Sequence, residues 1–176
     1  MEKIRISSQN PFMQNVAVLY QSAFPVNERR QMDEFYRLLD EEQKFNVDVF
    51  VDGDGSFVGF LSSWEFDDFR YGEHFAIVDS KRGGGIGARV LQEFVKASDK
   101  PLIIEVEPPL DEMAVRRIGF YQRNGLRLWD DIDYVQPPYG PGRDAIELKL
   151  MTFGDILLEQ GDSRIAEIHR YVYGAE

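Results

Sequence analysis

The chain of 176 residues contains no cysteine and only two histidines, His74 and His169. The lack of cysteine excludes disulfides, thiolate nucleophiles and thiolate metal sites. Two histidines far apart in the sequence do not by themselves indicate a metal centre, so we predict none. No apolar run approaches membrane-spanning length, and the N-terminal residues lack the apolar core of a signal peptide. We therefore expect a cytoplasmic protein that does not associate with membranes.

Basic residues are also few, with 20 Lys and Arg against 31 Asp and Glu, for a formal net charge of −11. Because nucleic-acid binding demands a basic surface, this balance argues against a nucleic-acid partner. An acidic surface favours a cationic amine substrate, although solubility accounts for it equally well. The apolar content of 43% and charged content of 29% are ordinary. The length fits a single domain, which we expect to span residues 1–176.

Apolar periodicity predicts the element order β-α-α-β-β-β-α-β-α-β-β and then a C-terminal helix within 153–173, interrupted near Gly161. Residues 67–72 and 131–140 read as loops. The order indicates an α/β sheet that is antiparallel at first and becomes parallel across the helix at 88–96. The strands are expected at 1–7, 46–51, 56–66, 75–78, 102–107, 126–129 and 145–150, and the helices at 12–24, 27–42, 88–96 and 111–123.

A glycine-rich run, residues 82–88, separates the apolar strand at 75–78 from the helix at 88–96. Unpaired backbone N–H groups and the positive end of a helix dipole meet there, which indicates a phosphate or pyrophosphate site. Gly83, Gly85 and Ala88 match the dinucleotide fingerprint G-x-G-x-x-G/A, and Glu105 follows roughly 20 residues on. Arg82, Gly85 and Gly87 match a second pattern, R/Q-x-x-G-x-G/A. A dinucleotide fold turns straight from strand into glycine, whereas four polar residues intervene here, so we favour the second pattern.

That second pattern is the pyrophosphate loop of the GNAT N-acetyltransferases, which this region resembles. Residues 118–126 resemble the second signature of the family, an aromatic pair four residues before a glycine. The resemblance implies the GNAT fold over residues 1–151, with a parallel pair of strands that splays, and a helical extension over 152–176. It also implies acetyl-CoA as co-substrate. The residues expected to bind it are Ile77 and Val78, through backbone N–H groups, together with Arg82, Gly83, Gly84, Gly85, Ile86, Gly87 and Arg117.

The resemblance places the Tyr121 hydroxyl near the sulfur of the thioester, where it can protonate the departing thiolate, whose pKa is about 8.5. The alternative is that Tyr121 is a core residue, since it shares a helix face with Ala114 and Ile118. The sequence departs from the family pattern at Ala114, where asparagine is common, and at Arg117, where alanine is common. Arg117 either meets a cofactor phosphate or is a surface arginine.

The attacking amine must first lose its proton, because a lysine-like ammonium has a pKa of about 10.4. Glu105 and Glu107 lie two residues apart on one strand and therefore project from the same face. Two neighbouring carboxylates can raise the pKa of one toward neutrality, as a base requires. The resemblance places this strand beside the acetyl group, and we prefer Glu105 as the base. The alternative is that both carboxylates lie at a solvated strand end.

For the acceptor, the resemblance points to residues 23–30 and 131–140, and Glu28, Glu107 and Tyr134 are the residues expected to contact it. These segments could instead serve ordinary capping and loop packing. The hypothesis is an acetyl-CoA-dependent N-acetyltransferase that acts by direct transfer on a primary amine of a small molecule or peptide. A homodimer is left open. Two alternatives remain: an acyl-CoA-binding sensor without activity, and a dinucleotide-dependent oxidoreductase that uses the same glycine loop.

Overall fold

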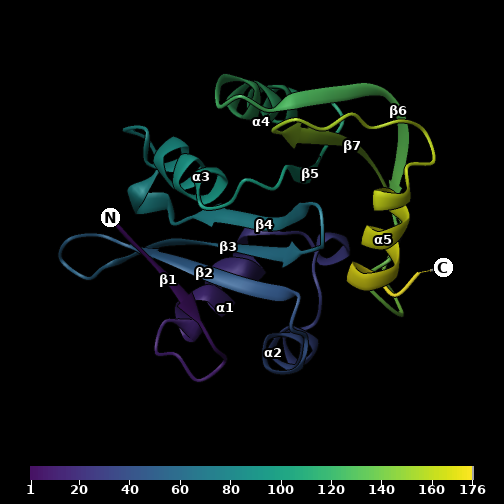
Figure 1. Ribbon diagram of the computed structural model, residues 1–176. Helices are drawn as coiled ribbons and strands as arrows, with labels where there is room; N and C mark the ends of the chain where they lie inside the picture. Colours follow the sequence, from purple (N-terminus) through teal and green to yellow (C-terminus); the bar gives the residue numbers. More distant parts are fainter. Residues whose placement is uncertain (176) are drawn as a thin grey trace.

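The computed structural model describes residues 1–175, which form a seven-stranded sheet in the order β1-β2-β3-β4-β5-β7-β6 (Figure 1). Neighbouring strands are antiparallel except for β4 and β5, which are parallel. The expected change from antiparallel to parallel pairing is therefore confirmed. The strands are β1 (Glu2–Ile6), β2 (Phe45–Val51), β3 (Phe57–Glu65), β4 (Arg70–Ile77), β5 (Leu102–Val106), β6 (Arg127–Gln136) and β7 (Ile146–Phe153).

Helices cover both faces of the sheet and bury two separate apolar clusters. One cluster gathers apolar side chains of α1, α2 and α5 against the sheet, and the other gathers those of α3 and α4. The mixed α/β architecture predicted from the sequence is thus confirmed. The helices are α1 (Met13–Ala23), α2 (Met32–Glu41), α3 (Ile86–Lys96), α4 (Glu112–Arg123) and α5 (Ser163–Val172), with short 3₁₀ helices η1 (Val26–Glu28) and η2 (Asp79–Lys81).

The parallel strands β4 and β5 separate after a short paired stretch. Only Arg70–Gly72 of β4 pairs with Leu102–Ile104 of β5, although β4 continues to Ile77. A bulge accompanies the separation: Ser62 pairs with His74 and Ser63 with Gly72, so Glu73 is the extra residue. Because a bulge bends its strand and increases the twist, it turns β4 away from its neighbour. The expected splayed pair is confirmed.

Strand β4 begins at Arg70, so the prediction of a turn over residues 67–72 was wrong for its last three residues. Arg70 is buried, and its guanidinium donates to the carbonyl oxygens of Phe94 and Val95 at 2.9 and 3.1 Å. Those carbonyls belong to the last turn of α3, where the carbonyl of Phe94 accepts only a 3.3 Å bond from the N–H of the C-cap residue Ala97. The charged side chain of Arg70 is therefore tolerated inside β4 because it caps the C-terminus of α3.

Strand β6 runs to Gln136, so the prediction that residues 131–140 form a loop was wrong for 131–136. Buried Ile132 and Tyr134 alternate with exposed Asp131 and Asp133, which is the period of a half-buried strand. The strand continues across an irregularity in its pairing with β7, located between Trp129 and Tyr134. Of the acceptor loop expected at 131–140, only residues 137–140 lie in the connection between β6 and β7.

Two helices begin later than the sequence predicted. Helix α2 starts at Met32 rather than Asn27, which lies in η1. Helix α5 starts at Ser163, because the Asp162 side chain accepts a hydrogen bond from the backbone N–H of Arg164 and caps it. Strand β7 extends to Phe153, so the expected helix over 153–173 is confined to its second half.

Within residues 1–175, no helix combines the length and the apolar character that crossing a membrane requires.

Candidate active site

A cavity of about 1040 Å³ opens where β4 and β5 separate. Its walls come from the second half of β4, the end of β5, the glycine loop, helix α4 and the segment around η1. The predicted residues that line it are Glu28, Ile77, Arg82, Gly83, Gly87, Glu105, Glu107, Arg117 and Tyr121. The fold therefore brings the predicted acid, the predicted base and part of the glycine loop to one space.

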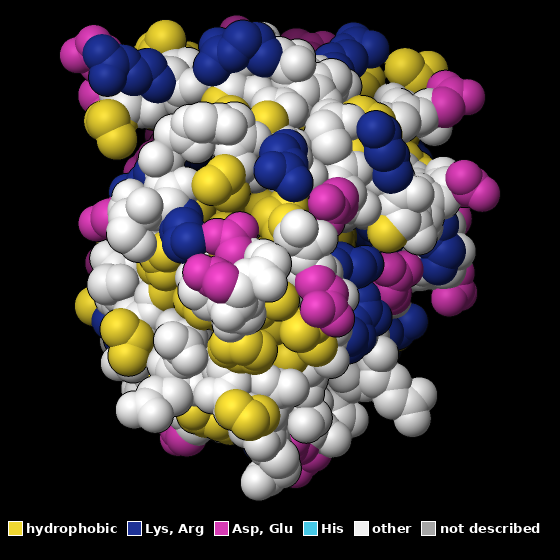
Figure 2. Space-filling view, turned by 90° about the vertical axis from the view of Figure 1, so that its left-hand side faces the viewer, with side chains coloured by type: hydrophobic (Ala, Val, Ile, Leu, Met, Phe, Trp, Pro, Cys, Tyr) yellow, Lys and Arg dark blue, Asp and Glu magenta, His cyan; other side chains and the backbone are white. Residues whose placement is uncertain are grey.

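Two smaller cavities adjoin this region. One of about 450 Å³ takes in Gly85 and Ile86 together with Phe120 and Arg123, and another of about 840 Å³ takes in Val78 beside α1. Strand β4 ends on the left of Figure 1, and Figure 2 looks onto that side, where acidic, basic and apolar side chains are interspersed. The glycine loop lies between the 1040 Å³ and 450 Å³ cavities, because Gly83 and Gly87 line both of them.

The glycine loop has the geometry of an anion cradle. Gly83, Gly84 and Gly85 all have left-handed backbone, with φ of 91°, 58° and 77°, and Gly85 caps the N-terminus of α3. A Cβ added at any of the three would meet no atom within 4 Å. Among the described residues, no acceptor takes up the N–H groups of Gly84, Gly85 or Gly87. Free N–H groups in open space at a helix start fit a phosphate group.

Two backbone N–H groups expected to face the cofactor are occupied. The N–H of Val78 donates to the carbonyl of Val58 at 3.0 Å, because β3 stays paired with β4 to its end. The N–H of Ile86 donates to the carbonyl of Gly83 at 3.3 Å, inside the loop. Alternation along an antiparallel strand directs the N–H of Ile77 to the opposite edge, which β5 has left. The N–H of Ile77 is therefore directed away from β3, whereas the N–H groups of Val78 and Ile86 already have acceptors within the protein.

Four arginines concentrate positive charge at the cavities of this acidic chain: Arg82, Arg116, Arg117 and Arg123. Arg82 donates to the carbonyl of Ile77 at 3.1 Å and pairs with Asp79 at 2.8 Å, which fixes it beside the loop. Arg117 pairs with Glu107 at 2.5 Å. Arg116 likewise pairs with Glu112 at 2.5 Å. An anionic ligand would therefore meet guanidinium groups whose charge is partly balanced by neighbouring carboxylates.

Glu105 lines the cavity on its side toward α5. Its Oε1 accepts a hydrogen bond from the Tyr134 hydroxyl, and its Oε2 accepts one from the Tyr173 hydroxyl at 2.7 Å. Burial raises the pKa of this carboxyl to about 7, although the tyrosine hydroxyls act in the opposite direction. A carboxylate with such a pKa can take and release a proton near neutrality.

Tyr121 faces the same cavity from α4. Burial raises the pKa of its hydroxyl to about 12, with nearby Arg117 acting against the rise. Within the described chain the hydroxyl donates to no acceptor, so its proton is available to a ligand. Ala114, two turns earlier on the same face of α4, donates its backbone N–H to the capping Asp111 side chain at 2.8 Å. The apolar side chain at 114 leaves the family's usual amide absent at this position.

Of the residues expected to contact an acceptor, Glu28 lines the cavity and Tyr134 does not. Burial, followed by the charge of Glu107, raises the pKa of Glu28, and Arg117 opposes the rise. The backbone carbonyl of Glu28 accepts from Nε2 of His74 at 2.8 Å, which ties this segment to β4. Tyr134 is only 3% exposed and lies behind Glu105, so its contact is with that carboxylate rather than with the open cavity.

Sequence reasoning missed a buried polar group beneath the cavity. Glu73, the bulged residue of β4, accepts hydrogen bonds from Arg30, from Trp64 Nε1 at 2.8 Å and from the Tyr139 hydroxyl at 2.9 Å. The Arg30 guanidinium also lies over the Tyr139 ring, 4.7 Å from its centroid. Glu73 and Tyr139 both line the cavity. Residue 73 falls between the predicted turn over 67–72 and the predicted strand over 75–78, so it received no structural assignment from the sequence.

Within residues 1–175, no three acidic or histidine side chains are grouped in a way that could hold a metal ion.

Comparison with known proteins bears on what this cavity does. Residues 13–126 match the acetyltransferase (GNAT) family. A protein from Bacteroides thetaiotaomicron described as a GNAT-family acetyltransferase has a TM-score of 0.94 and 34% identity, with 100% of both chains covered. No curated protein matches the sequence.

More distant structures share the fold. The spermidine N-acetyltransferase of Vibrio cholerae, solved with CoA and spermine, has a TM-score of 0.62 and 12% identity, over 86% of this chain and 94% of that one. An IAA acetyltransferase from Bacillus cereus has a TM-score of 0.59 and 14% identity, over 86% of this chain and 97% of that one. At these identities the likeness concerns the fold alone.

Proposed function

Because this chain belongs to the acetyltransferase (GNAT) family, we propose that it transfers an acetyl group from acetyl-CoA directly to a primary amine. The observation that carries the proposal is the meeting of the glycine loop, Tyr121 and Glu105 around one cavity of about 1040 Å³. The family also argues against the dinucleotide-dependent alternative, since its loop pattern includes the polar spacer before Gly83.

Acetyl-CoA is an anion whose pyrophosphate suits the glycine loop. The N–H groups of Gly84, Gly85 and Gly87 bind phosphate oxygens, and the start of α3 adds its dipole. Arg82 and Arg117 contribute positive charge on either side. The thioester then lies in the gap between β4 and β5, where Ile77 offers its N–H.

The transfer needs a proton acceptor and a proton donor. Glu105 takes a proton from the ammonium form of the acceptor, and the free amine attacks the thioester carbonyl. A C–N bond forms, and the C–S bond breaks as the tetrahedral intermediate collapses. Tyr121 gives its proton to the departing thiolate, the nitrogen loses its second proton to solvent, and Tyr121 is reprotonated from solvent while Glu105 releases the proton it took. The products are an N-acetylated amine and CoA, and no covalent enzyme intermediate forms.

The acceptor binds at the end of the cavity bounded by Glu28 and Tyr139. Carboxylate and aromatic walls suit a cationic amine. The Vibrio cholerae structure contains spermine, which makes polyamines the first members of an acceptor panel.

The test is CoA release from acetyl-CoA with a panel of spermidine, spermine, lysine, aromatic amines and peptides with free N-termini. We expect turnover with at least one cationic amine and none without an amine. Tight acetyl-CoA binding with no turnover on the whole panel would support the sensor alternative instead.

A further inference from the structure

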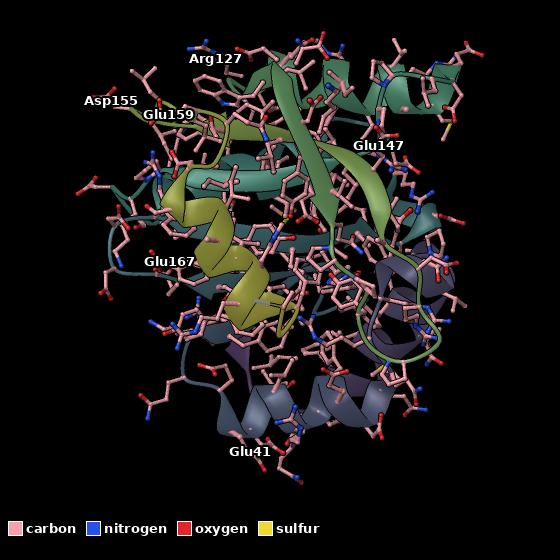
Figure 3. All side chains as sticks on the ribbon, turned by 90° about the vertical axis from the view of Figure 1, so that its right-hand side faces the viewer. Glu41, Arg127, Glu147, Asp155, Glu159 and Glu167 are labelled. Atoms are coloured by element: carbon pink, nitrogen blue, oxygen red, sulfur yellow. The ribbon has the colours of Figure 1, made fainter. Side chains whose placement is uncertain are left out.

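The C-terminal segment beyond α5 reaches the proposed base. Tyr173 is the C-cap residue of α5, and its hydroxyl donates to Oε2 of Glu105 at 2.7 Å, across 68 sequence positions. The GNAT match ends at residue 126, so this contact comes from outside the matched residues. Figure 3 looks onto this end of the molecule, with α5 in front of the sheet.

Tyr173 is held in place on several sides. Arg30, which is buried, donates to the backbone carbonyl of Val172 at 2.6 Å and so fixes the last turn of α5. The Tyr173 ring packs against Tyr139, with centroids 4.9 Å apart. The Tyr71 and Tyr173 hydroxyls lie 2.9 Å apart. An anchored phenol of this kind loses little freedom when it binds a carboxylate.

The hydrogen bonds orient Glu105 without filling its capacity as an acceptor. An ionised carboxylate has about four lone-pair sites, two on each oxygen. Tyr134 occupies one site on Oε1 and Tyr173 one on Oε2, and the nearby Tyr71 hydroxyl also favours the ionised carboxylate, so at most three of the four sites are taken. Since Glu105 lines the cavity, the remaining sites are open to a ligand's N–H.

We propose that Tyr173 is a positioning residue for Glu105, so that the C-terminal segment forms part of the catalytic apparatus. The proposal rests on the proposed role of Glu105 as base. The Tyr173 hydroxyl fixes the direction of the carboxylate and stabilises its charged form. Loss of the hydroxyl therefore raises the pH at which Glu105 becomes ionised.

Other groups also face Glu105 and set the background for such a measurement. Strand β4 contributes the Tyr71 hydroxyl, which favours the ionised carboxylate, and the charge of Glu73, which opposes it. Strand β6 contributes Tyr134. The ring of His169 packs against that of Tyr134, with centroids 5.4 Å apart, and burial lowers the pKa of His169. Strand β7 places apolar Leu150 opposite Glu105.

The test is Tyr173→Phe, which keeps the ring and removes only the hydroxyl. Carbon-13 NMR of protein labelled at the glutamate carboxyl carbon follows Glu105 directly, with Glu105→Gln identifying its resonance. We expect the midpoint of that titration to rise by about one pH unit, the effect of one hydrogen bond to a charged group. With an amine that responds in the panel, the acid limb of kcat/KM should move by the same amount.

The matched control is Tyr171→Phe on the same helix. Tyr171 is 40% exposed and its ring packs on Phe66, away from Glu105. It should leave both the titration and the acid limb unchanged. In the Glu105→Gln background, Tyr173→Phe should produce no further change in the pH profile.

The outcomes separate the two proposals. A wild-type titration of Glu105 in Tyr173→Phe overturns the positioning role, whatever the amine panel gives. An acid limb that survives Glu105→Gln overturns the assignment of the base instead. Loss of the limb in Glu105→Gln, together with a shift in Tyr173→Phe and none in Tyr171→Phe, supports both.

Discussion

Arg30 and Glu73 form an ion pair in which neither side chain has any exposed surface. Burial alone opposes ionisation of Glu73, but Arg30, His74 and the Trp64 N–H outweigh it and hold the pKa of Glu73 below its ordinary value. The pair joins the segment between η1 and α2 to the bulge of β4, from which the cavity opens. It therefore fixes the position of the cavity floor.

Removing the charge of Glu73 should destabilise the protein strongly. Glu73→Gln leaves the Arg30 guanidinium buried without a carboxylate, and breaking a buried pair in this way costs about 3–5 kcal/mol. Urea unfolding measures the loss. The control is Glu41→Gln, because Arg37 and Glu41 pair at 3.6 Å with side chains 56% and 67% exposed. That change should cost at most about 1 kcal/mol, and equal losses in the two variants would contradict the account.

Acetyl-CoA should stabilise the folded protein, because a ligand that binds only the native state shifts the folding equilibrium by mass action. At a concentration of about 100 times Kd, the expected gain is roughly 2.7 kcal/mol. Thermal unfolding with acetyl-CoA, CoA, NADH and NADPH makes the comparison. A rise in Tm with the nicotinamide cofactors alone would return the glycine loop to the dinucleotide interpretation.

Gly85→Asp should weaken acetyl-CoA binding severely. A carboxylate at this position repels the pyrophosphate, and its side chain fills the space that backbone N–H groups would share with the ligand. Calorimetric titration of CoA measures the loss. Gly55→Asp is the control for backbone strain, since Gly55 has a φ of 81° with open space around it and lies in the β2–β3 turn. Equal CoA affinity in the two variants would show that the loop is not the phosphate site.

The sequence predicted features of the site that local patterns encode. The glycine run and the apolar strand before it are contiguous, so spacing alone placed Gly83 and Gly85 at the start of a helix. Glu105 and Tyr121 came from a family resemblance, and the fold brings both to one cavity. The assignment of their chemical roles is still a prediction.

The features that the sequence did not predict depend on contacts between distant segments. Arg30 meets Glu73 across 43 positions and Tyr173 meets Glu105 across 68, and nothing near any of them marks a partner. The N–H of Val78 was expected to be free. Whether it has an acceptor depends on how far β3 stays paired with β4, and the sequence of β4 alone does not determine that. Apolar and acidic residues alternate over 131–136, which is a local signal for β6. The acidic residues were instead interpreted as part of a loop.

Tyr121→Phe should slow acetyl transfer by about 10²-fold, the lower range for a positioned acid, because it removes only the hydroxyl. The affinity for CoA should change little, since the glycine loop is untouched. The comparison is between kcat and the CoA Kd, with an amine that responds in the panel. Tyr36→Phe makes the same chemical change on α2 outside the cavity and should leave both quantities unaltered. Unchanged turnover in Tyr121→Phe from pH 6 to 9 would leave Tyr121 as a core residue.

Glu105→Gln should change the pH dependence of stability, in a direction that follows from the raised pKa. The folded-state pKa of about 7 lies above the ordinary value of 4.5, so between these pH values the native state holds a proton that the unfolded chain releases. Stability of the wild type therefore decreases as the pH rises through this window, because the ionised carboxylate is less favourable inside the protein. Glutamine does not titrate, so the variant avoids this loss. The Tm of Glu105→Gln relative to wild type should be higher at pH 8 than at pH 5, with the pH 5 value as the internal reference for any change in packing. A difference in Tm that stays constant across this range would mean that Glu105 titrates as an ordinary carboxylate. Its pKa would then lie well below the value near neutrality that the proposed base requires.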